Sequence, residues 1–491
     1  MKKLLSIIIV LSLILSSLLI ITTSCGEEEK KEEKNNNSEK VNSITEGDIF
    51  AERAAIDDGL ETVDFGGRKF RIVGHSGGEA NNVNNTEINQ GKLLTDANFY
   101  RTKTVEDRFN VDVEAVYVAG INEVADWVSK NVLSGADEFD LLVNHVLTSG
   151  GMVVKNLFLN WYDIPNVDFS KPWWAESNVS ELTVDGKAIL AISDFNSTAV
   201  SCTYALVFNK NLAASYDLGN LYEVVEDGRW TIDYLMDLIR DVYVDADGSG
   251  DRSEGDFYGM AQPTQSRLNQ WLWAFDNPIM TKDDEGLPAV AIKTDKINSI
   301  VTKIYDLCYN TQGVFYDPTY SNYSSMFLEK KTIFGIDHIG ALTGEEYRNF
   351  EDEYGILPLP KWDENQADYY SHSFGEHTVS AIPKTVKDTT FVGTIVEALA
   401  AESYKQVIPT FYEVALKTRY LRDNESKKMV DIIIKNRVFD FGYVYDNWKG
   451  FAYTLNDIIK SGNPNFESYY SRKYTGARYQ YKSIVKIFEK I

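Results

Sequence analysis

Early in the chain the sequence alternates between two hydrophobic periodicities, and this alternation leaves few folds open. Lys69–Gly74 and Phe139–Val143 are typical of strands, and Val111–Ala115 alternates as a strand does. Thr95–Phe109 is typical of a helix, and apolar residues between 121 and 132 recur on one helical face. A strand–helix–strand–helix–strand order favours a largely parallel sheet with helices on both faces, so we predict an α/β fold.

Later segments continue in the same style. Strands are predicted at Lys187–Ile192, Thr203–Asn209 and Lys331–Ile336, and Tyr354–Pro360 is extended. Thr231 is placed to cap a helix through Arg240, and the chain after about Thr389 is mainly helical. A length of 491 residues exceeds one ordinary core. We therefore expect two lobes of about 200 residues each.

The N-terminus carries an export signal. Lys2 and Lys3 precede an apolar run from Leu4 to Ile21, and small residues lead to Cys25. This pattern resembles the lipobox of bacterial lipoproteins, with Thr22 where such boxes usually carry Leu, Val or Ile. The resemblance implies a signal peptide over 1–24, palmitate and other lipid on Cys25, and a position on the outer face of the cytoplasmic membrane. An uncleaved transmembrane anchor is the alternative.

Residues 25–63 are predicted to form a disordered acidic tether. The run Glu27–Lys34 and the following Asn35–Ser38 contain no apolar side chain that a core could bury. The net charge of −24 excludes nucleic acid as a partner, and it excludes membrane contact other than through the lipid anchor. Cys202 and Cys308 could pair or remain two buried free thiols. We expect a monomer.

Five segments together resemble family-one extracellular solute-binding lipoproteins, the maltodextrin-binding class that serves ABC importers. These segments are Val105–Val111, Tyr204–Leu212, Gly228–Thr231, Tyr354–Trp362 and Thr378–Pro383. The resemblance implies a two-lobed periplasmic-binding-protein-like fold with hinge-crossing strands. It also implies that the chain captures a small-molecule ligand, a saccharide in this class, for ABC transporter permease subunits.

By the same analogy each lobe is discontinuous in sequence. The N-terminal lobe is expected over 64–198 and 332–376, and the C-terminal lobe over 204–328 and 380–491. The crossing segments would then be Thr203–Asn209 and Thr378–Pro383.

An acidic, glycine-containing loop at 245–256 matches the EF-hand spacing of calcium ligands, with Gly250 at the tight turn. Asp stands at the twelfth position in place of Glu, which predicts modest affinity and a structural role for calcium. An acidic surface turn without metal is the alternative. The predicted ligands are Asp245, Asp247, Ser249, the backbone of Asp251, Ser253 and Asp256.

Ligand residues in a hinge-closing binder lie at strand ends that face the cleft. Carboxylates, amides and imidazoles there can bond hydroxyl groups, and indole rings can stack on a sugar. Packing or a solvated turn is an equal explanation for each candidate. The candidates are His75, Asn144, Asp194, Trp271, Trp273, Asp337 and Glu376.

Enzyme motifs are missing from the sequence. His372–His377 lacks the HExxH spacing of a zinc protease, and no P-loop occurs. We therefore predict a binding protein and no enzyme. A surface lipoprotein that senses or adheres without transport is the first alternative, and a glycosidase with paired carboxylates is the second.

Overall fold

The structure is a computed structural model that describes residues 46–76, 78–79, 93–319, 323–411 and 424–491. The predicted signal peptide, Cys25 and the tether up to residue 45 lie outside the described residues. No helix within the described ranges is long and apolar enough to cross a membrane.

The prediction of a disordered tether is wrong for residues 46–63. Helix α2 spans Glu46–Ala54, and Arg53 donates to the backbone oxygen of Tyr404 at 3.0 Å. Asp58 is buried and accepts from the guanidinium of Arg108. Its charge is compensated by that guanidinium, which the composition of the segment alone does not show.

The first sheet has the order β13-β3-β1-β2, and β1 pairs in parallel with both β2 and β3. This confirms the parallel sheet predicted from the alternation. Strand β13 joins the edge antiparallel to β3. The elements are β1 (Arg68–His75), α4 (Leu93–Phe109), β2 (Val111–Val118), α5 (Ile121–Ser134), β3 (Leu141–His145) and β13 (Thr378–Ala381).

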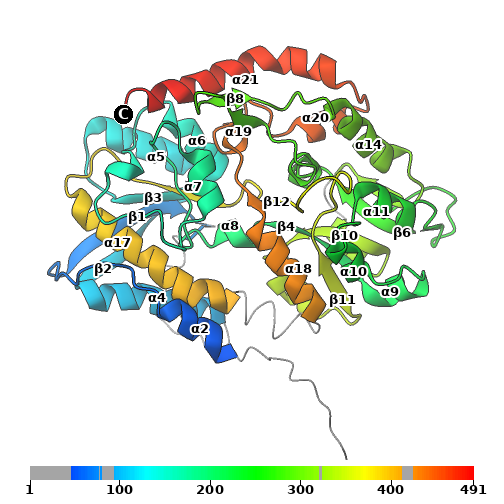
Figure 1. Ribbon diagram of the computed structural model, residues 1–491, viewed down its shortest axis with the longest axis horizontal. Coiled ribbons are helices and arrows are strands. Elements are labelled where there is room, and N and C mark those ends of the chain that lie inside the picture. The colour runs from blue at the N-terminus through cyan, green and yellow to red at the C-terminus, as the bar shows by residue number, and fades with distance from the viewer. Residues whose placement is uncertain (1–45, 77, 80–92, 320–322, 412–423) are drawn as a thin grey trace, which may run out of the picture. The chain divides into compact units, whose positions relative to one another are not determined.

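Both faces of this sheet are covered. Phe70 and Ile72 of β1 pack in one apolar cluster with α4 and α17 (Thr389–Glu402), whereas Val73 packs in another with α5. Figure 1 shows α17 and α4 side by side along one side of the strands. Alternate side chains therefore face two helical layers, which explains why the central strand β3 is buried at every position.

The second sheet has the order β11-β4-β10-β6-β5, with β9 also paired to β6. Strand β10 runs parallel to β6 and antiparallel to β4. Helix α11 begins after Thr231, whose hydroxyl accepts from the backbone of Tyr234 as predicted. The elements are β4 (Tyr204–Asn209), α11 (Ile232–Ile239), β5 (Tyr243–Val244), β6 (Phe257–Pro263), β9 (Val314–Asp317), β10 (Thr332–His338) and β11 (Tyr354–Leu357).

The predicted lobe boundaries are wrong in two places. Thr332–His338 was expected in the lobe of 64–198 but lies in the middle of the second sheet, between β4 and β6. Thr378–Ala381 and the following α17 belong to the first sheet and its helical layer, although 380–491 was expected in the other lobe. Apolar periodicity predicts that a segment is a buried strand and carries no information on which sheet buries it.

Two antiparallel segments link the sheets. Ala191 bridges to Ser380, and Thr203 bridges to Ser373. Residues 187–192 were predicted as a strand, but only Ala191 pairs with the first sheet, through its bridge to Ser380 of β13. Phe374 also donates its backbone N–H to Cys202.

The C-terminal part is mainly helical, as predicted. It comprises α18 (Asn424–Lys435), β14 (Arg437–Val438), α19 (Phe441–Val444), α20 (Thr454–Lys460) and α21 (Phe466–Phe488). Helix α18 packs on β11 of the second sheet, and α19 packs on α6 (Val146–Val153), which follows β3 of the first. Helix α21, red in Figure 1, contacts α14 (Ile297–Tyr309) and β8 (Pro288–Val290). The remaining elements are the helices α7 (Glu176–Leu182), α8 (Thr198–Ser201), α9 (Lys210–Ser215), α10 (Leu221–Glu226), α12 (Ser266–Asn269), α13 (Trp271–Ala274), α15 (Tyr323–Leu328) and α16 (Glu345–Arg348) and the strands β7 (Met280–Lys282) and β12 (Ser371–His372).

Candidate functional site

The carboxyl ends of β1 and β3 bring two predicted ligand residues together. His75 Nδ1 lies 3.0 Å from Asn144 Oδ1, and the amide nitrogen of Asn144 donates to the carbonyl of Ile121 at 3.3 Å. Because that amide group is the donor to Ile121, its oxygen accepts from His75, and Nδ1 carries the imidazole proton. The Nε2 atom of a neutral His75 is then an acceptor.

An exposed tryptophan stands over the end of β3. The Trp448 ring stacks on His145 with centroids 6.2 Å apart and lies 5.4 Å from the ring of Tyr453. Trp448 is 51% exposed, although tryptophan is usually well buried. Its backbone has φ 63°, a left-handed conformation that is strained for a bulky residue. Such strain is concentrated at ligand-binding sites in folded proteins.

Close packing holds the Trp448 loop in place. A Cβ at Gly150 would lie 2.1 Å from the Val444 carbonyl, so only glycine allows α6 to approach this segment. The buried carboxylate of Asp446 accepts from the backbone of Ala452 at 3.0 Å and from the hydroxyl of Tyr481 at 3.2 Å. The loop is thus fixed at both ends, and the indole of Trp448 is presented on a rigid support.

His145 lies beneath this indole as a neutral imidazole. Burial, together with the neighbouring His377 and His75, lowers the pKa of His145 to about 3. Its buried Nδ1 has no hydrogen-bond partner among the described residues. A buried polar atom of this kind is normally satisfied by water or by a ligand.

Glu376 is exposed and lies near His145. A Cβ at the preceding Gly375 would lie 3.5 Å from Cε1 of His145. Burial raises the pKa of Tyr453 to about 12, and the carboxylates of Asp446 and Glu376 contribute to the shift. The predicted ligand residue Glu376 is therefore close enough to act electrostatically on the aromatic platform formed by Trp448 and Tyr453.

The second sheet contributes a strained residue at the carboxyl end of β6. Gln265 is exposed and has φ 61°, ψ −137°, a region that is rare outside glycine. Asn456 of α20 fixes it, because its side-chain oxygen accepts from the backbone of Gln265 at 2.8 Å and from the hydroxyl of Thr264 at 2.9 Å. The helix that carries Asn456 follows directly after Tyr453.

The predicted ligand residue Asp337 lies at the end of β10 in the second sheet. Its carboxylate accepts from Arg267 at 3.2 Å and from the hydroxyl of Tyr347 at 3.0 Å, and both charged side chains are buried. The neighbouring His338 lies 5.1 Å from the ring of Phe374. Asp337 thus lies near the candidate site, but its oxygens are engaged by the protein.

Three other predicted ligand residues lie elsewhere. Trp271 is fully buried and donates to the side chain of Gln262 at 3.0 Å, and Trp273 is buried and donates to Asp440 at 2.8 Å. The cleft-facing position expected for both indoles is not observed, since each fills the core beside the second sheet. The backbone N–H of Asp194 donates to the carbonyl of Trp173, and burial raises the pKa of its carboxyl group to about 7.

Sequence reasoning missed Trp448, Tyr453 and Gln265. The clustering of aromatic residues with Gly450 between positions 445 and 453 was a signal that could have indicated an exposed turn. Gln265 had no such signal, because nothing in its neighbourhood predicts positive φ. Taken together, the site offers one exposed indole face, a neutral imidazole, a carboxylate and amide groups, which suit a polyhydroxylated ligand.

The calcium-like loop joins β5 to β6. Carboxylate oxygens of Asp245, Asp247 and Asp256 lie within 4.8 Å of one another. Asp256 is buried and accepts from the backbone of Ala246 and Ser253, so its carboxylate is held in place. Arg252, the basic residue of the loop, donates to the carbonyl of Val314. The donor set of hard oxygens fits calcium.

Two of the three glycines in the loop have positive φ. Gly248 and Gly250 have φ 70° and 78°, the left-handed conformation that a tight ion-binding turn requires.

Cys202 and Cys308 are both buried free thiols. Of the two possibilities left open by the sequence, the structure therefore shows free thiols.

Comparison with known proteins identifies the fold. No family model and no curated protein matches the sequence. An ABC substrate-binding protein from Listeria monocytogenes, solved in complex with cycloalternan, is 12% identical with a TM-score of 0.51 and covers 86% of this chain and 99% of its own. A cyclo/maltodextrin-binding protein complexed with maltotetraose is 14% identical with a TM-score of 0.54 and covers 86% of this chain and 96% of its own. The chain has the two-lobed α/β fold of these proteins, as expected from the sequence.

Proposed function

We propose that this chain is an extracytoplasmic solute-binding protein that captures an oligosaccharide for an ABC importer. The observation that carries the proposal is the exposed, strained Trp448, which stacks on His145 and is tilted against Tyr453 where the strand ends of the first sheet meet the C-terminal segment. The two solved structures of this fold named above are substrate-binding proteins, one with cycloalternan and one with maltotetraose.

The chemistry of the site matches a neutral sugar. One face of a pyranose ring is apolar and stacks on an indole, while its hydroxyls seek both donors and acceptors. The site supplies acceptors at Glu376 and at Nε2 of His75, and donors and acceptors at the side chain of Gln265. Ligand binding is expected to select the conformation in which both lobes contact the sugar.

Titration of the full chain with maltotetraose, cycloalternan and a wider carbohydrate panel tests this function. We expect saturable binding of at least one saccharide, a higher melting temperature with that ligand, and recovery of the ligand chemically intact after long incubation. Hydrolysis of the ligand would move the protein into the glycosidase class. Absence of binding across the panel would contradict the proposal.

We also propose that the chain is lipid-anchored through Cys25 on the outer face of the membrane. The support is the sequence of residues 1–25, which resembles a lipobox. The mature protein is expected to begin at Cys25 and to carry acyl chains, and Cys25→Ala should leave it without lipid. Mass spectrometry of the mature N-terminus is the measurement, and an unmodified Cys25 would contradict the anchor.

We further propose that the loop of residues 245–256 binds calcium and that the ion stabilises the β5–β6 connection. Calcium is expected to raise the melting temperature relative to chelator, because it binds only the folded loop. Asp245→Ala should abolish this increment. Asp251→Ala is the matched control and should retain it, since the spacing assigns only the backbone carbonyl of Asp251 to the ion. Identical melting of the unmodified chain in calcium and in chelator would show that the loop is a turn without metal.

A further inference from the structure

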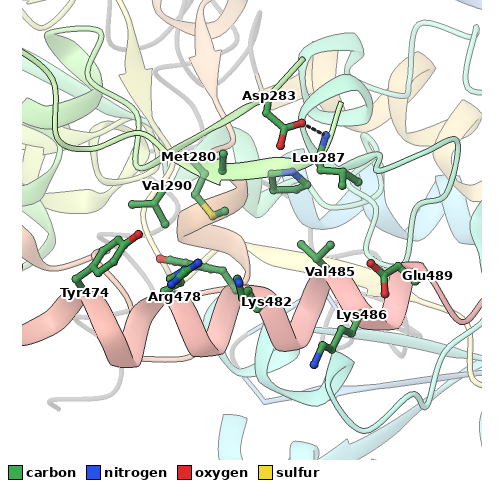
Figure 2. Close-up of a pocket in the computed structure, with 13 residues that line it drawn as sticks. Met280, Asp283, Leu287, Val290, Tyr474, Arg478, Lys482, Val485, Lys486 and Glu489 are labelled. Atoms are coloured by element: carbon green, nitrogen blue, oxygen red, sulfur yellow. Dashed lines mark hydrogen bonds between the residues drawn. The ribbon is translucent and has the colours of Figure 1, made fainter. Parts of the chain in front are cut away.

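A groove lies between the β7–β8 hairpin and helix α21, away from the strand ends that form the candidate saccharide site. Its volume is about 490 Å³, which is within the range of small-molecule sites. Figure 2 shows the hairpin above and one face of α21 below, with Met280 and Val290 pointing towards the helix. Neither the motifs of the sequence nor the saccharide proposal accounts for this cavity.

Three cations lie along the helical side of the groove. Arg478, Lys482 and Lys486 follow one another at intervals of four residues, so they share one face of α21. All three are exposed, and within the described part of the chain none of them forms an ion pair. This row of positive charge contrasts with the net charge of −24 of the whole chain.

The acidic residues of the groove do not neutralise this row. Asp283 lies on the hairpin, and its carboxylate accepts from the backbone of Glu285 at 3.1 Å and of Leu287 at 2.8 Å, as Figure 2 shows for Leu287. Glu489 lies one turn beyond the helical cations, at the far end of the groove. The middle of the groove therefore has a positive wall.

The remaining wall is apolar and aromatic. Val290, Val485 and the half-buried ring of Tyr474 line it, and the guanidinium of Arg478 lies 6.0 Å from the centre of that ring. A guanidinium next to an aromatic ring suits a planar anion, since it can form two parallel hydrogen bonds to a carboxylate or phosphate. An apolar wall beside it suits an aliphatic or aromatic body.

We propose that this groove is a second binding site, which takes an organic anion whose carboxylate or phosphate is carried on an apolar body. The anion contacts Arg478 and Lys482, and the body lies against Val290, Val485 and Tyr474. The anion and the saccharide contact different residues, because none of these five residues belongs to the strand ends described above.

Two fluorescent probes of nearly the same shape test the proposal on the full chain. One is 8-anilinonaphthalene-1-sulfonate, and the other is N-phenyl-1-naphthylamine, which lacks the sulfonate. We expect the anionic probe to bind at one site, more tightly than the neutral probe, and to bind less tightly as salt is added. The double variant Arg478→Glu/Lys482→Glu should weaken binding of the anionic probe about tenfold or more and leave the neutral probe unchanged.

Two controls separate the groove from general effects. Arg472→Glu/Lys460→Glu makes the same change in net charge outside the groove and should leave both probes unaffected. Val485→Trp should fill the groove and displace both. Equal binding of the anionic probe to the two charge-reversed variants would overturn the proposal. Displacement of the probe by benzoate or by phenyl phosphate identifies the anion, and displacement by neither would also overturn it.

Discussion

Replacing Trp448 with alanine is expected to weaken saccharide binding by about 1–3 kcal/mol, the range for a nucleic-acid base stacked on an aromatic side chain. The indole is the large exposed aromatic surface at the candidate site, and His145 and Tyr453 hold it in one orientation. A pre-oriented ring loses little conformational entropy when the ligand binds. Calorimetric titration of the full chain with its cognate saccharide measures the loss.

The backbone of Trp448 allows a second, independent check. Because φ is 63°, glycine at this position removes the steric strain while deleting the ring. Trp448→Gly is therefore expected to lose binding without a lower melting temperature, which a merely structural tryptophan would not do. Tyr216→Ala serves as the control, since Tyr216 is a partly exposed ring stacked on Phe257 near the start of β6, at the opposite end of that strand. Full-strength binding in both Trp448 variants would remove the platform from the proposed site.

Replacing Asp440 with alanine is expected to lower the free energy of unfolding by about 3–5 kcal/mol. The buried carboxylate accepts from the indole of Trp273 and from the backbone N–H groups of Ile279, Met280 and Gly442. Alanine leaves these buried donors without an acceptor, and each such group costs about 1–3 kcal/mol. Urea titration of the full chain, monitored by tryptophan fluorescence, gives the change.

Asp363→Ala is the matched control for Asp440. Asp363 also accepts from two backbone N–H groups, those of Asn365 and Gln366, but it is exposed. Water can replace it there, so a loss below about 1 kcal/mol is expected. If the two variants lose equal stability, the hydrogen bonds to Asp440 do not contribute to the stability of the fold.

The fold class was predictable because it depends on local patterns. Strands β1, β2 and β3 and helices α4 and α5 follow from apolar periodicity over short windows, and their parallel pairing follows from the helices between them. Thr231 as a helix cap follows from side-chain chemistry within one turn. His75 and Asn144 could be named because they are polar residues at the carboxyl ends of buried strands, and Glu376 because it directly precedes the segment expected to cross between the lobes.

Only the tertiary structure decided how distant segments of the chain lie relative to one another. The position of β10 between β4 and β6, the return of β13 to the first sheet and the burial of Trp271 and Trp273 depend on which surfaces meet. Periodicity records how one segment alternates and does not record its partner. The site's aromatic face depends on positive φ at Trp448, in a segment that packs closely on Gly150 and is bonded through Asp446 to Ala452. The sequence by itself therefore determined the kinds of elements and their order, whereas the burial of each side chain was decided by long-range packing.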